Sequence, residues 1–249
     1  MKKLDLKNVS NYIEENISSF HEAREEGLKH LKLSQILTKK NPYLFKAKNI
    51  NTSEKFVGAL VNAFLSSQEE TMFGGFLERL AIFVCNNVYG GKKSSAEGID
   101  LEFEKDGVIY IVAVKSGTNW GNASQISKMK ENFRKAKQRL RTNSKKKPVE
   151  AINGCCYGRI TKTDKGEYHK IAGQKFWEFI SANKELYTEI IEPLGHRARE
   201  RNEKFSKEYD KMINIFTQQF SKEFCIDGEI NWKKIVQLNS GTEKIKVNI

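Results

Sequence analysis

The stretch from Gly98 to Gly117 constrains the fold more than any other part of the chain, because its pattern is that of two strands joined by a tight turn. Residues 99–104 alternate apolar and acidic side chains, which is typical of a half-buried strand. Residues 108–114 form an almost unbroken run of β-branched and aromatic residues, as expected of a central strand covered on both faces. The Asp106-Gly107 pair between them favours a type I′ turn, which needs positive φ at both central positions. The sequence therefore predicts a β-hairpin.

The register of this hairpin would bring an acid and a base together. If the two turn residues form the loop, counting outward places Asp100 directly opposite Ala113. Lys115 lies two residues further along, on the same face of its strand. The hairpin would then carry a carboxylate and an ammonium at the ends of two neighbouring strands. The inference depends on register, because a slip of one residue would send Lys115 to the other face.

These residues resemble the motif of the PD-(D/E)xK nucleases, and more closely that of the type II restriction endonucleases among them. The resembling segments are Gly98–Asp100, Val114–Gly117 and Asn119–Gln125. The resemblance covers about residues 70–180 and implies a restriction-endonuclease-like α/β fold, with a mixed sheet of about four or five strands flanked by helices. It also implies, by position, that Asp100 is a metal ligand and Lys115 the catalytic lysine.

The chain departs from the family pattern at the second acidic position, which is Ala113. The family binds Mg²⁺ with an acid there, so either the site is crippled or its second carboxylate comes from elsewhere. Our preferred source of the second carboxylate is Glu78, in the helix predicted before the hairpin. The alternative for Glu78 is a solvated charge paired with a nearby Arg or Lys. The rival is Glu102, which shares the face of Asp100 but lies further from Lys115. We expect the Ala113 carbonyl to fill a further metal position.

Hydrophobic periodicity predicts helices before and after this core. The expected helices are residues 8–40, a helix from about Ser53, then 71–89 with an early interruption at Gly74-Gly75, 124–141, 174–180, a long helical stretch from Tyr187 and a last helix over 232–238; further strands are expected at 149–157 and 166–172. We therefore divide the chain into a helical N-terminal region for packing or dimerisation (1–70), a nuclease core (71–180) and a helical C-terminal region (181–249).

The charge of the chain favours a polyanionic partner. The formal net charge is +12, although a generally Lys-rich composition is the alternative explanation. Residues 128–147 hold ten basic side chains against one acid, Glu131. A solvated helix face usually mixes signs, so this bias favours phosphate contacts. Gln125 would lie in the first turn of this helix, where backbone N–H groups and its side-chain amide could meet a phosphate. The alternative is a residue at the helix N-terminus without a binding role. The predicted DNA contacts are Lys92, Lys93, Asn119, Trp120, Asn122, Ser124, Gln125, Lys128, Arg134, Lys135 and Arg139.

Other classes of protein lack support in the sequence. The four cysteines show no CxxC pair, so we expect reduced thiols in a cytoplasmic protein. The four histidines are scattered without metal-ligand spacing, which argues against zinc chemistry. No phosphate-binding P-loop spacing is present. No secretory signal and no apolar run of about 18 residues occurs, so we expect a soluble chain without contact to membranes.

The expected function is that of a type II site-specific deoxyribonuclease that hydrolyses double-stranded DNA with Mg²⁺. A palindromic site would call for a homodimer with one active site per strand. Two alternatives stay open. One is a different nuclease of the same superfamily, of the junction resolvase or repair type. The other is a non-catalytic DNA-binding module that has lost its acid at Ala113.

Overall fold

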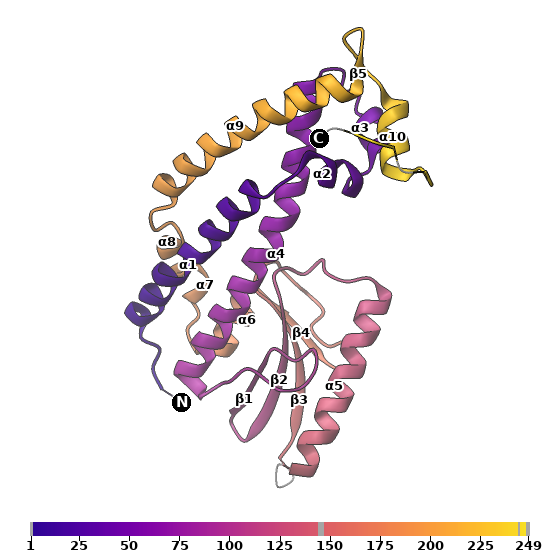
Figure 1. Cartoon of the computed structure of the whole chain (residues 1–249). Coiled ribbons are helices and arrows are strands. Elements are labelled where there is room, and N and C mark those ends of the chain that lie inside the picture. The colour runs from indigo at the N-terminus through magenta and orange to yellow at the C-terminus, as the bar shows by residue number, and fades with distance from the viewer. Residues whose placement is uncertain (1, 144–146, 244, 248–249) are drawn as a thin grey trace. The chain divides into compact units, whose positions relative to one another are not determined.

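The computed structural model describes residues 2–143, 147–243 and 245–247 (Figure 1). The chain forms two compact units. Unit 1 comprises Met1–Ser18 and Phe73–His196, and unit 2 comprises Ser19–Met72 and Arg197–Ile249. The first residues of the chain thus group with the expected nuclease core, whereas the sequence analysis placed them in a separate N-terminal region. Helices α1 (Leu6–Lys29) and α4 (Ser53–Tyr89) supply residues to both units.

Unit 1 is built on a mixed four-stranded sheet in the order β1-β2-β3-β4. Strand β1 is antiparallel to β2, whereas β2, β3 and β4 run parallel to one another. The strands are β1 (Leu101–Lys105), β2 (Val108–Lys115), β3 (Val149–Cys155) and β4 (His169–Ala172), and the helices that follow are α5 (Ala123–Asn143), α6 (Gln174–Ser181), α7 (Leu186–Glu189) and α8 (Ile191–Leu194). This mixed α/β architecture confirms the predicted fold class.

The hairpin of β1 and β2 has the register that the sequence predicts. Its two turn residues both adopt positive φ, 51° and 77°. Lys105 pairs with Val108 beyond the turn, and the register continues to the start of β1. The next pair outward is therefore the predicted one, Asp100 and Ala113. The local turn chemistry is enough to fix which residues of the two strands face each other.

Helices cover both faces of the sheet. On one face, α5 buries Met129 and Phe133 against a cluster that includes Ile111 of β2, and Figure 1 shows the helix running along the strands. On the other face, Phe179 of α6 packs edge-on against Tyr110 of β2, with 4.9 Å between ring centroids. Strand β2 is therefore buried on both sides, as its apolar run predicts.

Helix α4 is one continuous helix of 37 residues. The sequence analysis expected two helices here, with an interruption at Gly74-Gly75, and that expectation is wrong. Glycine in a helix costs only about 1 kcal/mol relative to alanine, which is too little to end a helix with a long buried stripe. Gly74 also has a packing role, because a Cβ at this position would lie 2.6 Å from Oγ of Ser116, just beyond β2.

Other element bounds also differ from the sequence analysis, and β3 ends at Cys155, whereas the sequence predicted residue 157. The predicted helix 8–40 is divided into α1 and α2 (Leu33–Lys39). Strand β4 begins only at His169, whereas the sequence predicted residue 166, because Gly166 at φ 80° belongs to the preceding turn, where its N–H donates to Asp164.

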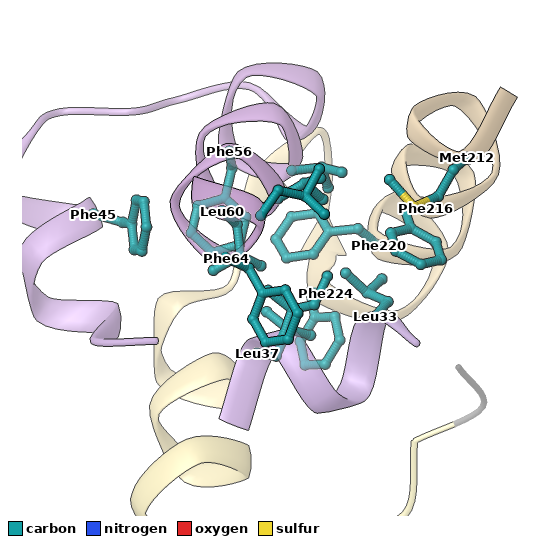
Figure 2. Packing of buried hydrophobic residues seen from close by; sticks show 14 of the residues in the cluster. Leu33, Leu37, Phe45, Phe56, Leu60, Phe64, Met212, Phe216, Phe220 and Phe224 are labelled. Atoms are coloured by element: carbon teal, nitrogen blue, oxygen red, sulfur yellow. The ribbon is translucent and has the colours of Figure 1, made fainter. Parts of the chain in front are cut away.

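Unit 2 is mainly helical, and aromatic and aliphatic side chains fill its core (Figure 2). Phe56 of α4 packs against Phe220, with 4.8 Å between ring centroids. The remaining elements of this unit are α3 (Pro42–Ala47), α9 (Ala198–Phe224), the short hairpin of β5 (Cys225–Ile226) and β6 (Glu229–Ile230), and α10 (Trp232–Ser240). Within the described residues, no helix combines the length and the apolar character needed to cross a bilayer.

Candidate active site

Asp100 is fixed at the start of the hairpin by two main-chain hydrogen bonds. Its own N–H donates to the carbonyl of Val112 over 2.9 Å, and its Oδ2 accepts the N–H of Val114 over 2.7 Å. The side chain is only 20% exposed. The carboxylate therefore has one oxygen tied to the main chain of β2 and a defined direction.

Lys115 ends β2 beside this carboxylate. Its Nζ lies 4.0 Å from Oδ2 of Asp100, and the side chain is 35% exposed. The structure thus brings together the acid and the base that the hairpin register predicted. An ammonium and a half-buried carboxylate lie side by side at the end of a rigid strand, where the carboxylate is a suitable ligand for a hard cation.

Trp120 lies beneath the catalytic lysine candidate. The ammonium of Lys115 is 5.3 Å from the centroid of its ring, within the range of a cation–π contact. Nε1 of Trp120 donates to Oδ1 of Asn153 over 3.0 Å, and Nδ2 of Asn153 donates to the carbonyl of Ala113 over 3.1 Å. Asn153 is 1% exposed, so both of its polar atoms are satisfied inside the protein.

This contact gives Trp120 a structural role that the sequence analysis did not foresee. Trp120 was predicted to contact DNA, and Asn153 was not singled out. One signal was present in the sequence: a lone asparagine inside the apolar strand β3 needs a partner when it is buried. The identity of that partner could not be deduced, because it lies in a different loop.

Glu78 of α4 faces the same end of the sheet. It follows Gly74 by one helical turn and so lies on the side of α4 that approaches Ser116. Its carboxylate is 29% exposed and lies 3.7 Å from Nζ of Lys93. Lys93, which the sequence analysis placed among the DNA contacts, is therefore the ion-pair partner of this acid.

The pKa of the Asp100 carboxyl is raised above its ordinary value. The main cause is burial, and the second is the negative charge of Glu78; the ammonium of Lys115 and the hydrogen bond from Val114 act in the opposite direction. A carboxylate whose charge is disfavoured by burial and by a neighbouring acid forms an environment in which a cation is stabilised.

Glu102 has a different set of partners. Its Oε2 accepts a hydrogen bond from Oγ of Ser94 over 3.2 Å and lies 3.8 Å from the guanidinium of Arg139 on α5. Among the described residues, no group of three or more His, Cys, Asp or Glu side chains is arranged to hold a metal ion. The structure therefore does not gather Asp100, Glu78 and Glu102 into one three-carboxylate site.

The main-chain carbonyls at the end of β2 alternate in direction. The Ala113 carbonyl, predicted to be a metal ligand, accepts the hydrogen bond from Asn153 on the β3 side. The N–H of Val114 points to Asp100, and in a strand the carbonyl of a residue points to the same neighbour as its N–H. The geometry thus favours the Val114 carbonyl over that of Ala113 as the main-chain oxygen on the side of Asp100.

Six of the seven basic side chains of α5 are already paired with acids; the exception among the described residues is Arg141. Arg134 lies 2.6 Å from Glu167, and Lys128 lies 3.5 Å from Glu97. Further pairs of this helix are Lys130–Glu167, Lys135–Glu131, Lys137–Glu150 and Arg139–Glu102, and Lys147, beyond the helix, pairs with Glu104. The sequence analysis counted one acid in residues 128–147 because the other carboxylates come from distant segments. Residues 144–146 of that basic stretch lie outside the described residues.

The other predicted DNA contacts lie near the hairpin or at the start of α5. Asn122 and Gln125 cap this helix reciprocally: the N–H of Gln125 donates to Oδ1 of Asn122 over 3.0 Å, and the N–H of Asn122 donates to Oε1 of Gln125 over 2.9 Å. Their side chains thus have a structural task. The exposed residues among the remaining candidates are Lys92, Asn119 and Ser124.

Comparison with known proteins identifies the family of the chain. A search of curated proteins finds no match to the chain. The family model described as type II restriction endonuclease EcoO109I matches residues 7–202, which include the hairpin, Glu78 and Asn153. The match spans most of the 249 residues of the chain. The chain therefore belongs to the EcoO109I family of type II restriction endonucleases.

Proposed function

We propose that this restriction endonuclease hydrolyses phosphodiester bonds at a specific site in double-stranded DNA, with Mg²⁺ as its cofactor. The observation that carries the proposal is the placement of Lys115 Nζ 4.0 Å from Asp100 Oδ2 at the end of a central strand. The proposal includes the roles of the individual side chains, the bound Mg²⁺ and a homodimer. It also includes a cytoplasmic location, which the free cysteines support.

The oxygen donors near Asp100 fit a magnesium ion. Mg²⁺ prefers carboxylate and carbonyl oxygens and is usually bound through one or two carboxylates. Asp100 and Glu78 would hold it, with the Val114 carbonyl as the main-chain candidate, and Glu102 stays the weaker alternative because Arg139 and Ser94 already engage it. A bound Mg²⁺ would neutralise charge on the phosphate and help to generate the attacking nucleophile.

Lys115 would act on the phosphate and on the attacking water. Its ammonium can orient that water and offset the charge that develops on the phosphate oxygens. The contact with Trp120 restricts the movement of the lysine side chain, and the bond from Trp120 to buried Asn153 fixes the ring. A pre-positioned charge needs no reorganisation during the reaction, so this support would contribute to the rate.

A homodimer would place one such site on each strand of a palindromic sequence. We propose this arrangement because the family cuts specific duplex sites and because a single site of this kind has one catalytic lysine. Cleavage of both strands in one binding event would then require two chains.

The proposal is tested by digesting plasmid DNA with the purified chain, with Mg²⁺ and with a chelator, and sequencing the ends. Asp100→Ala and Lys115→Ala should each lower cutting by at least about 10³-fold, as expected for a residue acting on the transition state, and should leave binding to the site largely intact. Either variant cutting at a near wild-type rate would remove this pair from the mechanism.

The carboxylate assignment is tested by a matched pair of variants. Glu78→Gln should abolish cleavage, because it keeps the shape and removes the charge that a cation needs. Glu102→Gln should be mild. The opposite result, with Glu102→Gln inactive and Glu78→Gln active, would show that this assignment is wrong while the nuclease function stands.

A second candidate function is favoured by Ala113, which puts a methyl group where the PD-(D/E)xK pattern has an acid. In that case the chain would bind DNA without cutting it. Metal-dependent cleavage by the wild-type chain that is lost in Lys115→Ala would exclude this function.

A further inference from the structure

Strand β3 ends beside the active site. The N–H of Cys156 donates to the carbonyl of Lys115 over 2.8 Å, and the N–H of Tyr157 donates to the carbonyl of Ser116 over 2.9 Å. The chain therefore leaves the sheet next to the catalytic lysine candidate. The sequence analysis expected Tyr157 to end this strand and assigned no role to the residues before the next one.

Three cations lie on this segment and on the helix that follows it. Residues 157–163 read Tyr-Gly-Arg-Ile-Thr-Lys-Thr and contain no acid. Arg159 and Lys162 are exposed, as is Lys175 in the first turn of α6. Arg159 and Lys175 border the same cavity, of about 760 Å³. None of the three forms an ion pair with any residue that the structure describes, so their charges are uncompensated.

Glycines hold the beginning of the segment against the loop after Lys115. A Cβ on Gly117 would lie 2.5 Å from the ring of Tyr157, and a Cβ on Gly158, whose φ is 98°, would lie 2.8 Å from Thr118. The ring of Tyr157 is nevertheless 56% exposed. An aromatic side chain is thus held at the surface against Gly117, two residues after the catalytic lysine candidate.

The basic face of α5 differs from this segment both in the pairing of its charges and in its position along the sheet. Six of its seven cations, all but Arg141, have carboxylate partners within 4 Å among the described residues, so a phosphate there would have to displace an existing ion pair. The helix also runs back along the sheet: Lys137 pairs with Glu150, near the start of β3. Its C-terminal half therefore lies toward the end of the sheet opposite to Lys115.

We infer that the DNA backbone next to the cleaved bond lies on Tyr157, Arg159, Lys162 and Lys175, which we call the β3-loop surface, and not on the basic face of α5. The inference rests on the proposed function. Free cations release counterions when they bind phosphates, and an exposed aromatic ring beside them can stack on a base or a sugar.

Two triple variants test the inference. Arg159→Gln/Lys162→Gln/Lys175→Gln removes three charges from the β3-loop surface. Lys130→Gln/Arg134→Gln/Lys135→Gln is the matched control on α5, because it lowers the net charge by the same amount. The measurement is the affinity for a labelled duplex of random sequence at several salt concentrations between about 50 and 200 mM.

The first triple variant should flatten the plot of log affinity against log salt by about two to three units, since each phosphate contact contributes about 0.9. The α5 variant should change the slope by less than about one unit. Tyr157→Ala should weaken binding without changing the slope, because the ring carries no charge.

An equal change in both triple variants, or a larger one in the α5 variant, overturns the inference. If the wild-type chain cuts DNA with Mg²⁺ but the first triple variant keeps the full slope, the inference fails while the proposed function stands. A wild-type chain that neither binds nor cuts duplex DNA would overturn both. Unchanged thermal unfolding of the variants shows that they are folded, as expected for exposed side chains.

Discussion

At the scale of single residues, Asp100 is the position where stability and function oppose each other. Its carboxylate is 20% exposed and close to the charge of Glu78, and both conditions disfavour ionisation. A cation would remove that penalty, but the folded chain has to bear it when no cation is bound. We therefore expect the fold to be less stable with Asp100 than with a neutral side chain of the same shape at this position.

Replacing Asp100 with asparagine should stabilise the fold. The folded pKa of Asp100 is above the ordinary value of 3.8, so ionisation costs nothing below that value, and stability is lost as the pH rises through the folded pKa. Asp100→Asn keeps an acceptor for the N–H of Val114 and removes the charge. We expect a melting temperature at pH 7 that is a few degrees higher than that of the wild type, since about 1 kcal/mol shifts it by about 2–4 °C in a chain of this size.

The pH dependence provides the control for this prediction. The difference between Asp100→Asn and the wild type should vanish as the pH falls toward 3.8. Saturating Mg²⁺ should raise the melting temperature of the wild type more than that of the variant. A variant that is less stable than the wild type at pH 7 would contradict this account of Asp100.

Sequence reasoning succeeded for residues whose positions depend on a single turn. Asp100 and Lys115 could be paired because a two-residue loop fixes the register of a hairpin. Trp120 and Asn153 could not be paired, because their contact joins a loop to a strand that a whole helix separates in the chain. The acids that pair with α5 could not be predicted for the same reason, because residues such as Glu167 lie far from the helix in the sequence.

At the scale of elements, the close approach of α4 to the end of β2 determines where Glu78 lies. Gly74 leaves no room for a Cβ, with Oγ of Ser116 only 2.6 Å from that position, whereas a Cβ on neighbouring Gly75 would meet its nearest atom at 3.5 Å. The two glycines are adjacent in sequence but differ in function. The pattern of hydrophobic residues predicted a helix here, and it could not show that this helix continues through both glycines.

Alanine substitutions should separate the two glycines. Gly75→Ala should stabilise the fold by up to about 1 kcal/mol, because alanine favours the helix and nothing obstructs its methyl group. Gly74→Ala should gain less or lose stability, since the hydroxyl of Ser116 must move. The double variant Gly74→Ala/Ser116→Ala should recover the gain. The free energy of unfolding in urea is measured for the wild type, the two single variants and the double variant. Equal gains for the two single variants would show that Gly74 is not a packing residue.

At the scale of the whole molecule, the net charge of +12 is a poor guide to the DNA-binding surface. Surface ion pairs contribute little to stability, yet they decide which cations stay available to a phosphate. Arg159, Lys162 and Lys175 near the end of β3 have no ion-pair partner among the described residues, whereas most cations of α5 have one. Predicting that distribution requires the fold, because it depends on which distant carboxylates come close.

The cysteines should report on opening of the chain. Cys85, Cys155 and Cys156 are buried, and burial raises the pKa of each thiol, that of Cys85 to about 12. Cys225 is partly exposed. Because the thiolate is the reactive form, a chromogenic thiol reagent should modify one cysteine quickly and three only when unit 1 opens.

The variant Cys225→Ser should abolish the fast phase and leave the slow phase unchanged. Mass spectrometry of the labelled peptides identifies which thiol has reacted. Rapid modification of Cys85 or Cys156 in the native protein would mean that unit 1 opens far more easily than its buried core indicates.

The contact between Gly74 and Ser116 has a consequence for a cell that makes this protein. If both acids lay on the hairpin, the metal ligands would be in place as soon as that short segment had folded. Here the proposed second acid reaches the hairpin only when α4 has docked against β2. An incomplete or misfolded chain would then not cut the DNA of the cell, because the proposed active site is complete only in the folded protein.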